Sequence, residues 1–387
     1  MSETAPQPAP TAVAAVWTRP PVPRAGLGAR VLGVIGIVLA SIGVVIAFAY
    51  LGLAFGPTGV IIDLLVALVP LAVVLLVIRW LDRWEPEPFW ARTFAFLWGA
   101  GASIVIALVV DASVQYYDFH ANLRYDDVTA ALVRSPIVEE AAKGFGVVLI
   151  FFVMRRTFDG PVDGIVYGAT VAAGFAFVEN IQYFANALHE GGGADLAATF
   201  FVRGMLSPFA HLVFTSCTGA GLGLATRVRS RGAGVLLFLG GLAAAMLLHS
   251  AFNSVGLADG SAYGWLGVYG LIEVPLFLLI VLFVVLARRQ EEEHTHRALG
   301  QYQAAGWFTA DEVAMLGTGR GRQAARRWAR SVGRAAPMNA FIADATKLAQ
   351  TRQRIETGRG VPAARRDERM LLAAVTSDRG ALQPALR

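Results

Sequence analysis

Residues Thr58–Ile78 read TGVIIDLLVALVPLAVVLLVI, an apolar run in which Asp63 is the one charged side chain. A helix needs about 20 apolar residues to cross a bilayer, and lipid cannot satisfy the open backbone groups of other structures. This run therefore predicts a membrane-spanning helix. The composition agrees, because 56% of the 387 residues are hydrophobic and 16% are charged, whereas soluble domains are roughly 25% charged.

Similar runs lie on both sides of this stretch. We predict eight spans, at residues 31–54, 58–78, 93–111, 136–154, 163–186, 198–226, 233–256 and 265–287. The fold class is thus predicted to be all-α, a polytopic transmembrane helix bundle of about eight spans with tails in the cytoplasm.

The connector charges support this order. Arginines recur in every second connector, as the positive-inside rule requires; these are Arg79, Arg83, Arg92, Arg155, Arg156, Arg227, Arg229, Arg231, Arg288 and Arg289. The opposite connectors carry none, except the 112–135 loop, where three aspartates accompany two arginines. Both chain ends are therefore predicted to lie in the cytoplasm.

The two ends of the chain differ from the spans in composition. Residues 1–30 are rich in proline and alanine and are predicted to be a disordered cytoplasmic tail, ahead of an eight-helix transmembrane domain at 31–287. Residues 288–387 hold 18 of the 33 Lys and Arg and are predicted to be a basic cytoplasmic tail, partly helical and then disordered from about residue 351. Thr309 and Glu312 form a capping box. A basic helix follows, either solvated or lying on anionic inner-leaflet lipid, the expected partner in place of nucleic acid.

Several ionisable residues fall inside the predicted spans. Each costs about 2.5–3.5 kcal/mol or more to insert and is a functional-site hypothesis by default. The segment Pro136-Ile-Val-Glu-Glu-Ala-Ala-Lys143 opens one span, and further polar residues lie in the next three; the set is Glu139, Glu140, Lys143, Glu179, His211, His249 and Asn253.

The predicted topology brings these groups to overlapping depths. Glu139 and Glu140 lie about one turn below the outer surface. Glu179 lies 16 residues after Asp163, about 24 Å above the inner surface at 1.5 Å per residue. His249 is at a similar height and His211 is nearer the middle. A site toward the outer leaflet is therefore expected.

Spacing within the helices suggests pairs. Glu139 and Lys143 are four residues apart and share a face, whereas Glu140 points about 100° away toward another partner. Lys143 is one of only two lysines in the chain, which suggests a need for a compact ammonium there. Carboxylates beside two histidines can activate water.

These motifs resemble the PrsW intramembrane protease family, which is related to the CAAX prenyl endopeptidases. The resemblance rests on Glu139-Glu140-x-x-Lys143, Phe175-x-x-x-Glu179-Asn180, His211 and His249-x-x-x-Asn253. The polar segments 82–88 and 163–168 also look like those of the family, and the likeness covers about residues 80–256.

The resemblance implies hydrolysis of membrane protein substrates in the bacterial plasma membrane, as in site-one cleavage of an anti-sigma factor near its extracytoplasmic side. The family is classed as metallopeptidases. The chain lacks His-Glu-x-x-His, so Zn²⁺ held by the scattered carboxylates and imidazoles, and Glu/His water activation without metal, both stay open.

Roles follow as expectations. One of Glu139 and Glu140 is the general base, and Lys143 keeps the pair ionised. Glu179, His211 and His249 are the expected metal ligands; Glu179 could instead orient a ligand, and the histidines could stabilise the oxyanion. Asn253 is expected to donate to the developing oxyanion.

Two other classes of function compete with a protease. Intramembrane Glu and His also build the proton relays of a proton-coupled transporter, but such proteins tend to show inverted repeats, which we do not find in this sequence. A non-catalytic membrane scaffold would tolerate alanine at both glutamates.

Overall fold

The computed structural model describes residues 17–18, 20–22, 27–84, 86–123, 126–154, 158–257, 270–271, 274–358 and 360–383. All regular secondary structure in these residues is helical, which confirms the predicted all-α class. The chain divides into two units. The transmembrane unit comprises residues 24–293 with 356–359, and the C-terminal unit comprises the remaining residues at both ends of the chain.

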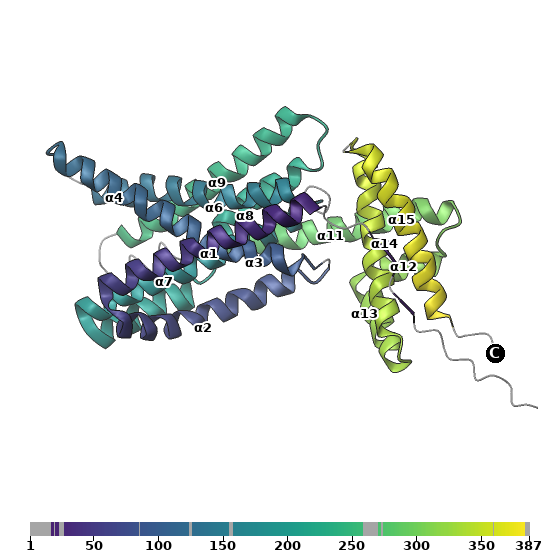
Figure 1. Cartoon of the computed structure of the whole chain (residues 1–387), viewed down its shortest axis with the longest axis horizontal. Coiled ribbons are helices and arrows are strands. Elements are labelled where there is room, and N and C mark those ends of the chain that lie inside the picture. The colour runs from purple at the N-terminus through teal and green to yellow at the C-terminus, as the bar shows by residue number, and fades with distance from the viewer. Residues whose placement is uncertain are drawn as a thin grey trace, which may run out of the picture. The chain divides into compact units, whose positions relative to one another are not determined.

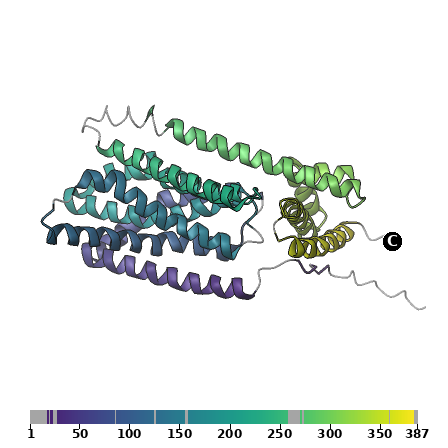
Figure 2. The ribbon, with the colours of Figure 1, turned by 90° about the horizontal axis from the view of Figure 1, so that it is seen from above.

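The helices of the transmembrane unit run side by side along a common direction (Figures 1 and 2). Three of its segments, labelled η, are π-helical. In chain order the elements are α1 (Leu27–Phe55), α2 (Pro57–Leu81), α3 (Phe89–Leu97), η1 (Trp98–Ser103), α4 (Ile104–His120), α5 (Asp127–Thr129), η2 (Ala130–Arg134), α6 (Ser135–Val153), α7 (Pro161–Phe200), η3 (Phe201–Leu206), α8 (Ala210–Ala225), α9 (Arg231–Leu257) and α11 (Val274–Ala304).

Five stretches of the described chain are long and apolar enough to cross a membrane. They are Leu27–Phe55, Pro57–Leu81, Phe89–His120, Pro161–Ala225 and Arg231–Val255. The fourth is bent where Gly192 leaves helical geometry, with φ of 68°. The count of eight spans stays a prediction, and part of the predicted span 265–287 lies outside the described residues.

Helix α7 packs closely against α8, because glycines face each other between them. A Cβ added to Gly164 would lie 1.9 Å from the carbonyl oxygen of Gly219, and the reverse distance is also 1.9 Å. No side chain fits between these two backbones, so we call this pair the glycine contact. Small residues permit such close approach between helices in membranes.

A buried polar cluster ties the start of α7 to the segment between α2 and α3. Asp82 accepts the backbone N–H of Glu87 at 2.9 Å and pairs with Arg92 at 2.9 Å. Tyr167 donates its hydroxyl to Glu87 at 2.6 Å. Burial raises the pKa of Asp82 to about 6, although Glu87 and Arg92 act in the opposite direction. The two polar segments noted in the sequence therefore meet here.

The C-terminal unit contains the end of α11, from His294 onward, with four further helices. These are α12 (Ala310–Leu316), α13 (Gly319–Ser331), α14 (Ala335–Glu356) and α15 (Val361–Leu382). The predicted capping box of Thr309 and Glu312 is confirmed. Disorder was expected from about residue 351, but α15 is helical there, because Leu371 and Val375 bury one face of it in the core of the unit. The predicted tail 1–30 falls largely outside the described residues.

Candidate active site

Helix α6 places three charged side chains in the interior of the transmembrane unit. Glu139 is nearly buried, and Glu140 and Lys143 are fully buried. The Lys143 ammonium lies 2.6 Å from Glu140 Oε1 and 3.5 Å from Glu139 Oε2. Lys143 thus contacts the expected partner one helical turn away, but its shorter contact is with Glu140, three residues away.

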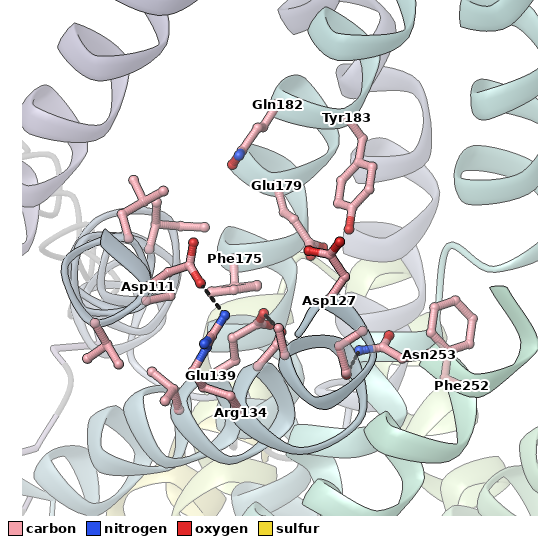
Figure 3. Close-up of a pocket in the computed structure, with 18 of the residues that line it drawn as sticks. Asp111, Asp127, Arg134, Glu139, Phe175, Glu179, Gln182, Tyr183, Phe252 and Asn253 are labelled. Atoms are coloured by element: carbon pink, nitrogen blue, oxygen red, sulfur yellow. Dashed lines mark hydrogen bonds and ion pairs between the residues drawn. The ribbon is translucent and has the colours of Figure 1, made fainter. Parts of the chain in front are cut away.

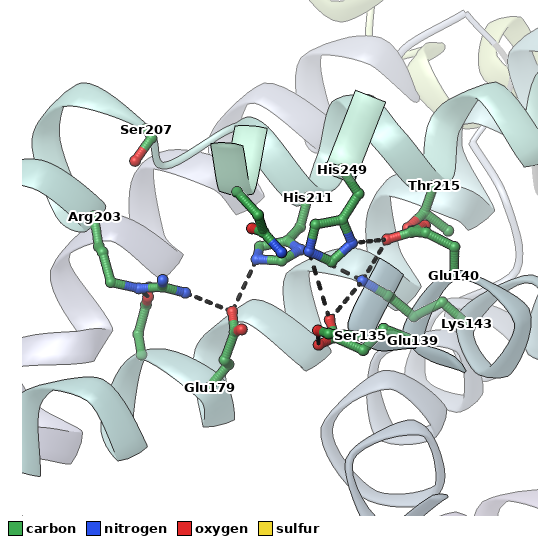
Figure 4. Close-up of polar contacts among 12 residues, drawn as sticks. Ser135, Glu139, Glu140, Lys143, Glu179, Arg203, Ser207, His211, Thr215 and His249 are labelled. Atoms are coloured by element: carbon green, nitrogen blue, oxygen red, sulfur yellow. Dashed lines mark hydrogen bonds and ion pairs between the residues drawn. The ribbon is translucent and has the colours of Figure 1, made fainter. Parts of the chain in front are cut away.

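His249 of α9 contacts both glutamates (Figure 4). Its Nδ1 lies 3.1 Å from Glu140 Oε1, and its Nε2 lies 3.9 Å from Glu139 Oε2. We assign the proton to Nδ1, which then donates to Glu140 and leaves the Nε2 lone pair facing Glu139. Thr215 of α8 donates to the other oxygen of Glu140 at 2.8 Å, so the fully buried carboxylate is held on both sides.

His211 of α8 is held by a different carboxylate. Its Nε2 lies 2.8 Å from Glu179 Oε2 on α7, so we assign the proton to Nε2. Glu179 also pairs with Arg203 of η3 at 2.5 Å, and Arg203 donates to the Asn180 side chain at 2.9 Å. The free Nδ1 of His211 faces the Lys143 ammonium at 3.4 Å. The rings of His211 and His249 meet edge to face, with centroids 5.1 Å apart.

Three of these residues form a possible metal site. One ligand atom each from Glu139, His211 and His249 lie within 4.8 Å of one another. A carboxylate and two imidazoles are a donor set of catalytic zinc sites, which keep a further position open. Each imidazole is oriented by a carboxylate outside this set, Glu140 or Glu179, as metal-bound histidines usually are. The donor set therefore fits a zinc ion.

The charges of the cluster are compatible with this fit. Three carboxylates face two cations, Lys143 and Arg203, so the cluster has a net charge of −1 with neutral histidines, and a zinc ion would change it to +1. The Lys143 ammonium lies close to the same ligand atoms, but its shortest contact is with Glu140, which is not a member of the set. Glu179, an expected ligand, also lies outside the set. It contacts Nε2 of His211 and leaves Nδ1 for a metal ion.

The side chain of Asn253 has a different partner from the one expected. It donates to the carbonyl oxygen of Ala131 at 2.7 Å, and Ser250 on the same helix donates to Leu132 at 2.6 Å. Both contacts hold the π-helical segment η2 against α9. Asn253 also lines the cavity described below, so the oxyanion role expected from the sequence stays a prediction beside this contact with η2.

A cavity of about 600 Å³ adjoins the cluster (Figure 3). Of the site residues, Glu139, Glu179, Arg203 and Asn253 line it, whereas Glu140 does not. Its walls come from α4, α5, η2, α6, α7, η3 and α9. The cavity therefore gives one glutamate of the adjacent pair access to water and substrate.

Sequence reasoning missed several partners in this cluster. Thr215, Ser135 and Arg203 all contact its carboxylates. Thr215 and Ser135 give no signal, because hydroxyl residues are common in helices of membranes. Arg203 carries an intramembrane charge, which is a signal, but the sequence does not identify Glu179 as its partner.

Comparison with known proteins gives consistent matches. The model of a family described as "PrsW family intramembrane metalloprotease" matches residues 87–286, just over half of the chain. A "Protease PrsW" of Geobacillus kaustophilus is 32% identical over 140 residues, which are 36% of this chain and 55% of that protein. The same-named protein of Oceanobacillus iheyensis is 25% identical over 213 residues, 54% of this chain and 86% of that protein. That of Bacillus subtilis is 29% identical over 174 residues, 45% and 73% of the two chains. No solved structure matches.

Proposed function

The chain belongs to the PrsW family of intramembrane metalloproteases, and from this premise we propose that it hydrolyses peptide bonds of membrane-anchored proteins. Membership of a protease family favours hydrolysis over the transport and scaffold alternatives. The match to the Geobacillus relative spans little more than half of that protein.

The convergence of Glu139, His211 and His249 is the observation that carries the proposal. These residues come from three helices, α6, α8 and α9, and are all buried. Burying a carboxylate and two imidazoles in a low-dielectric interior costs free energy, so their convergence favours a functional site. Glu139 connects this group to the cavity, where a substrate and water can enter.

In this proposal, Glu139, His211 and His249 would hold the metal ion, which we propose to be zinc. When bound, the metal would activate water and polarise the scissile carbonyl. Glu140 and Glu179 are positioning residues, since Glu140 keeps the proton on Nδ1 of His249 and Glu179 keeps it on Nε2 of His211.

The remaining charged groups support these positions. Of the two adjacent glutamates, Glu139 is the one that lines the cavity, so we assign to Glu139, rather than Glu140, the position next to the substrate. Lys143 balances the charge of Glu140.

We further propose that cleavage occurs near the extracytoplasmic side of a bacterial plasma membrane. The alternation of arginine-rich connectors supports this placement, because it puts both chain ends in the cytoplasm and the polar groups toward the outer leaflet. The resemblance to the family suggests a single-span protein such as an anti-sigma factor as substrate. The arginines of α13 are proposed to contact anionic lipid, and Arg320, Arg327 and Trp328 are exposed on that helix.

Reconstitution of the purified protein with single-span membrane substrates tests the hydrolytic proposal. Cleavage is expected in the untreated protein, and its loss is expected with a chelator and in the Glu139→Gln variant. Glu190→Gln changes an exposed glutamate and serves as the matched control. Cleavage that survives both the chelator and Glu139→Gln would exclude this site.

A further inference from the structure

Two amide side chains of α7 line the cavity beyond the charged cluster. Gln182 and Asn186 lie three and seven residues after Glu179, so all three share one face of the helix. All three line the cavity, and Figure 3 shows Gln182 beside the open space above Glu139. Among the described residues, neither amide has a recorded hydrogen-bond partner, although both are half-buried. The donors and acceptors of both amides are therefore available to a ligand that enters the cavity.

A peptide substrate in this cavity has a specific need. A peptide bond inside a helix is shielded, so the substrate must unwind locally before water can attack it. The unwound backbone then exposes N–H and C=O groups, and each costs several kcal/mol if lipid surrounds it. A site that cleaves such a segment must therefore supply hydrogen-bond partners to the substrate backbone.

The spacing of the two amides meets this need. Four residues of helix advance about 6 Å, close to the ~6.6 Å over which an extended strand repeats groups on the same side. Each amide offers two N–H donors and one acceptor oxygen, so each can pair with both kinds of backbone group. The apolar side chains of Ile104 and Leu108 on α4 line the same cavity and can contact apolar side chains of the substrate.

We propose that Gln182 and Asn186 form a backbone-binding edge, which holds a locally unwound, extended stretch of a membrane-spanning substrate beside Glu139. This inference rests on the proposed proteolytic function and names its substrate class. The class is a transmembrane segment with weak helix propensity at the cleaved position, such as one containing glycine. Because the contacts are to the backbone, the edge binds substrate segments that unwind locally and does not distinguish between particular side chains.

A binding experiment tests the edge apart from cleavage. Fluorescent single-span peptides are titrated into reconstituted Glu139→Gln protein, with and without Gln182→Leu or Asn186→Leu. Each leucine is expected to weaken binding about 3- to 10-fold, the equivalent of one net hydrogen bond. Gln303→Leu, which replaces an exposed amide of the C-terminal unit, should leave binding unchanged. Gln182→Asn, which keeps an amide, should recover part of the affinity.

Substrates with one backbone amide replaced by an ester identify the contact itself. An ester at the paired position should weaken binding to the parent protein but have little further effect on Gln182→Leu or Asn186→Leu. Leucine variants whose peptide affinity is within twofold of that of the parent protein would overturn the proposal. So would losses of affinity from the ester that are the same in the leucine variants as in the parent protein.

The binding and cleavage measurements test the backbone-binding edge and the protease function separately. Cleavage by the wild-type chain together with unaffected binding by the leucine variants removes the edge and leaves the protease. Weakened binding of the leucine variants, together with no cleavage by the wild-type chain, leaves the edge as a peptide-binding site and removes the protease.

Discussion

Replacing Lys143 with methionine should destabilise the transmembrane unit strongly. The ammonium is fully buried, 2.6 Å from Glu140 and 3.5 Å from Glu139. At an effective dielectric constant of about 20, these separations correspond to attractions of about 6 and 5 kcal/mol. Desolvation offsets much of this attraction, but removing one partner leaves buried carboxylates uncompensated. We therefore expect the free energy of unfolding to fall by about 3–5 kcal/mol.

Equilibrium unfolding in mixed detergent micelles, followed by tryptophan fluorescence, measures this loss. Lys347→Met, which changes the only other lysine in the chain, should cost less than about 1 kcal/mol. Glu140→Gln combined with Lys143→Met should cost about 2 kcal/mol less than the sum of the two single changes, because the pair is removed together. A Lys143→Met variant within 1 kcal/mol of wild type, or strictly additive losses, would refute the reasoning.

Three further predictions concern metal, pH and lipid. Calorimetric titration of the metal-stripped protein with zinc should show one binding site. His211→Ala should abolish it, and Glu179→Gln should weaken its zinc affinity about 10- to 100-fold. Zinc affinities of both variants equal to that of the wild-type protein would exclude the site. Since the raised pKa of Asp82 means that the folded state binds this proton more tightly, its stabilising effect is full below about pH 4 and lost as pH rises through 6. Asp82→Asn should therefore make the unfolding temperature less dependent on pH between these two values. An unchanged dependence on pH would contradict this account. An environment-sensitive dye at Trp328→Cys, in a chain lacking Cys217, should shift to the blue in anionic nanodiscs at low salt, and the same shift in neutral nanodiscs would argue against lipid charge recognition.

The sequence predicts the helical class and the members of the polar cluster well. Charges are rare in membrane-spanning runs, so Glu139, Lys143 and His249 stand out from their surroundings without any knowledge of packing. The positive-inside pattern and the helical rise predict a common depth for the polar groups, and in the structure the groups from α6, α7, α8 and α9 contact one another. These inferences need only composition and spacing, which the sequence contains.

Which side chains pair with each other inside the cluster could not be predicted from the sequence. Glu139 and Glu140 are adjacent in sequence, and only the rotation of α6 decides which one faces the cavity and which one orients His249. That rotation depends on packing against α7, α8 and α9. Asn253 shows the same limitation, since its carbonyl partner lies on η2, more than 100 residues earlier. The helical α15 was missed because its arginines obscured an apolar face that is buried by other helices of its unit.

The glycine contact between α7 and α8 fixes the position of the His211 imidazole along the helix axis relative to the Glu179 carboxylate. Gly164 lies 15 residues before Glu179, and Gly219 lies eight residues after His211, so the hydrogen bond between the two polar residues is remote from the place where the backbones touch. Any side chain inserted there would push the helices apart or make one slide along the other, and the His211–Glu179 separation of 2.8 Å would change with it. Replacing either glycine with a larger residue should therefore impair the activity, although neither glycine belongs to the polar cluster.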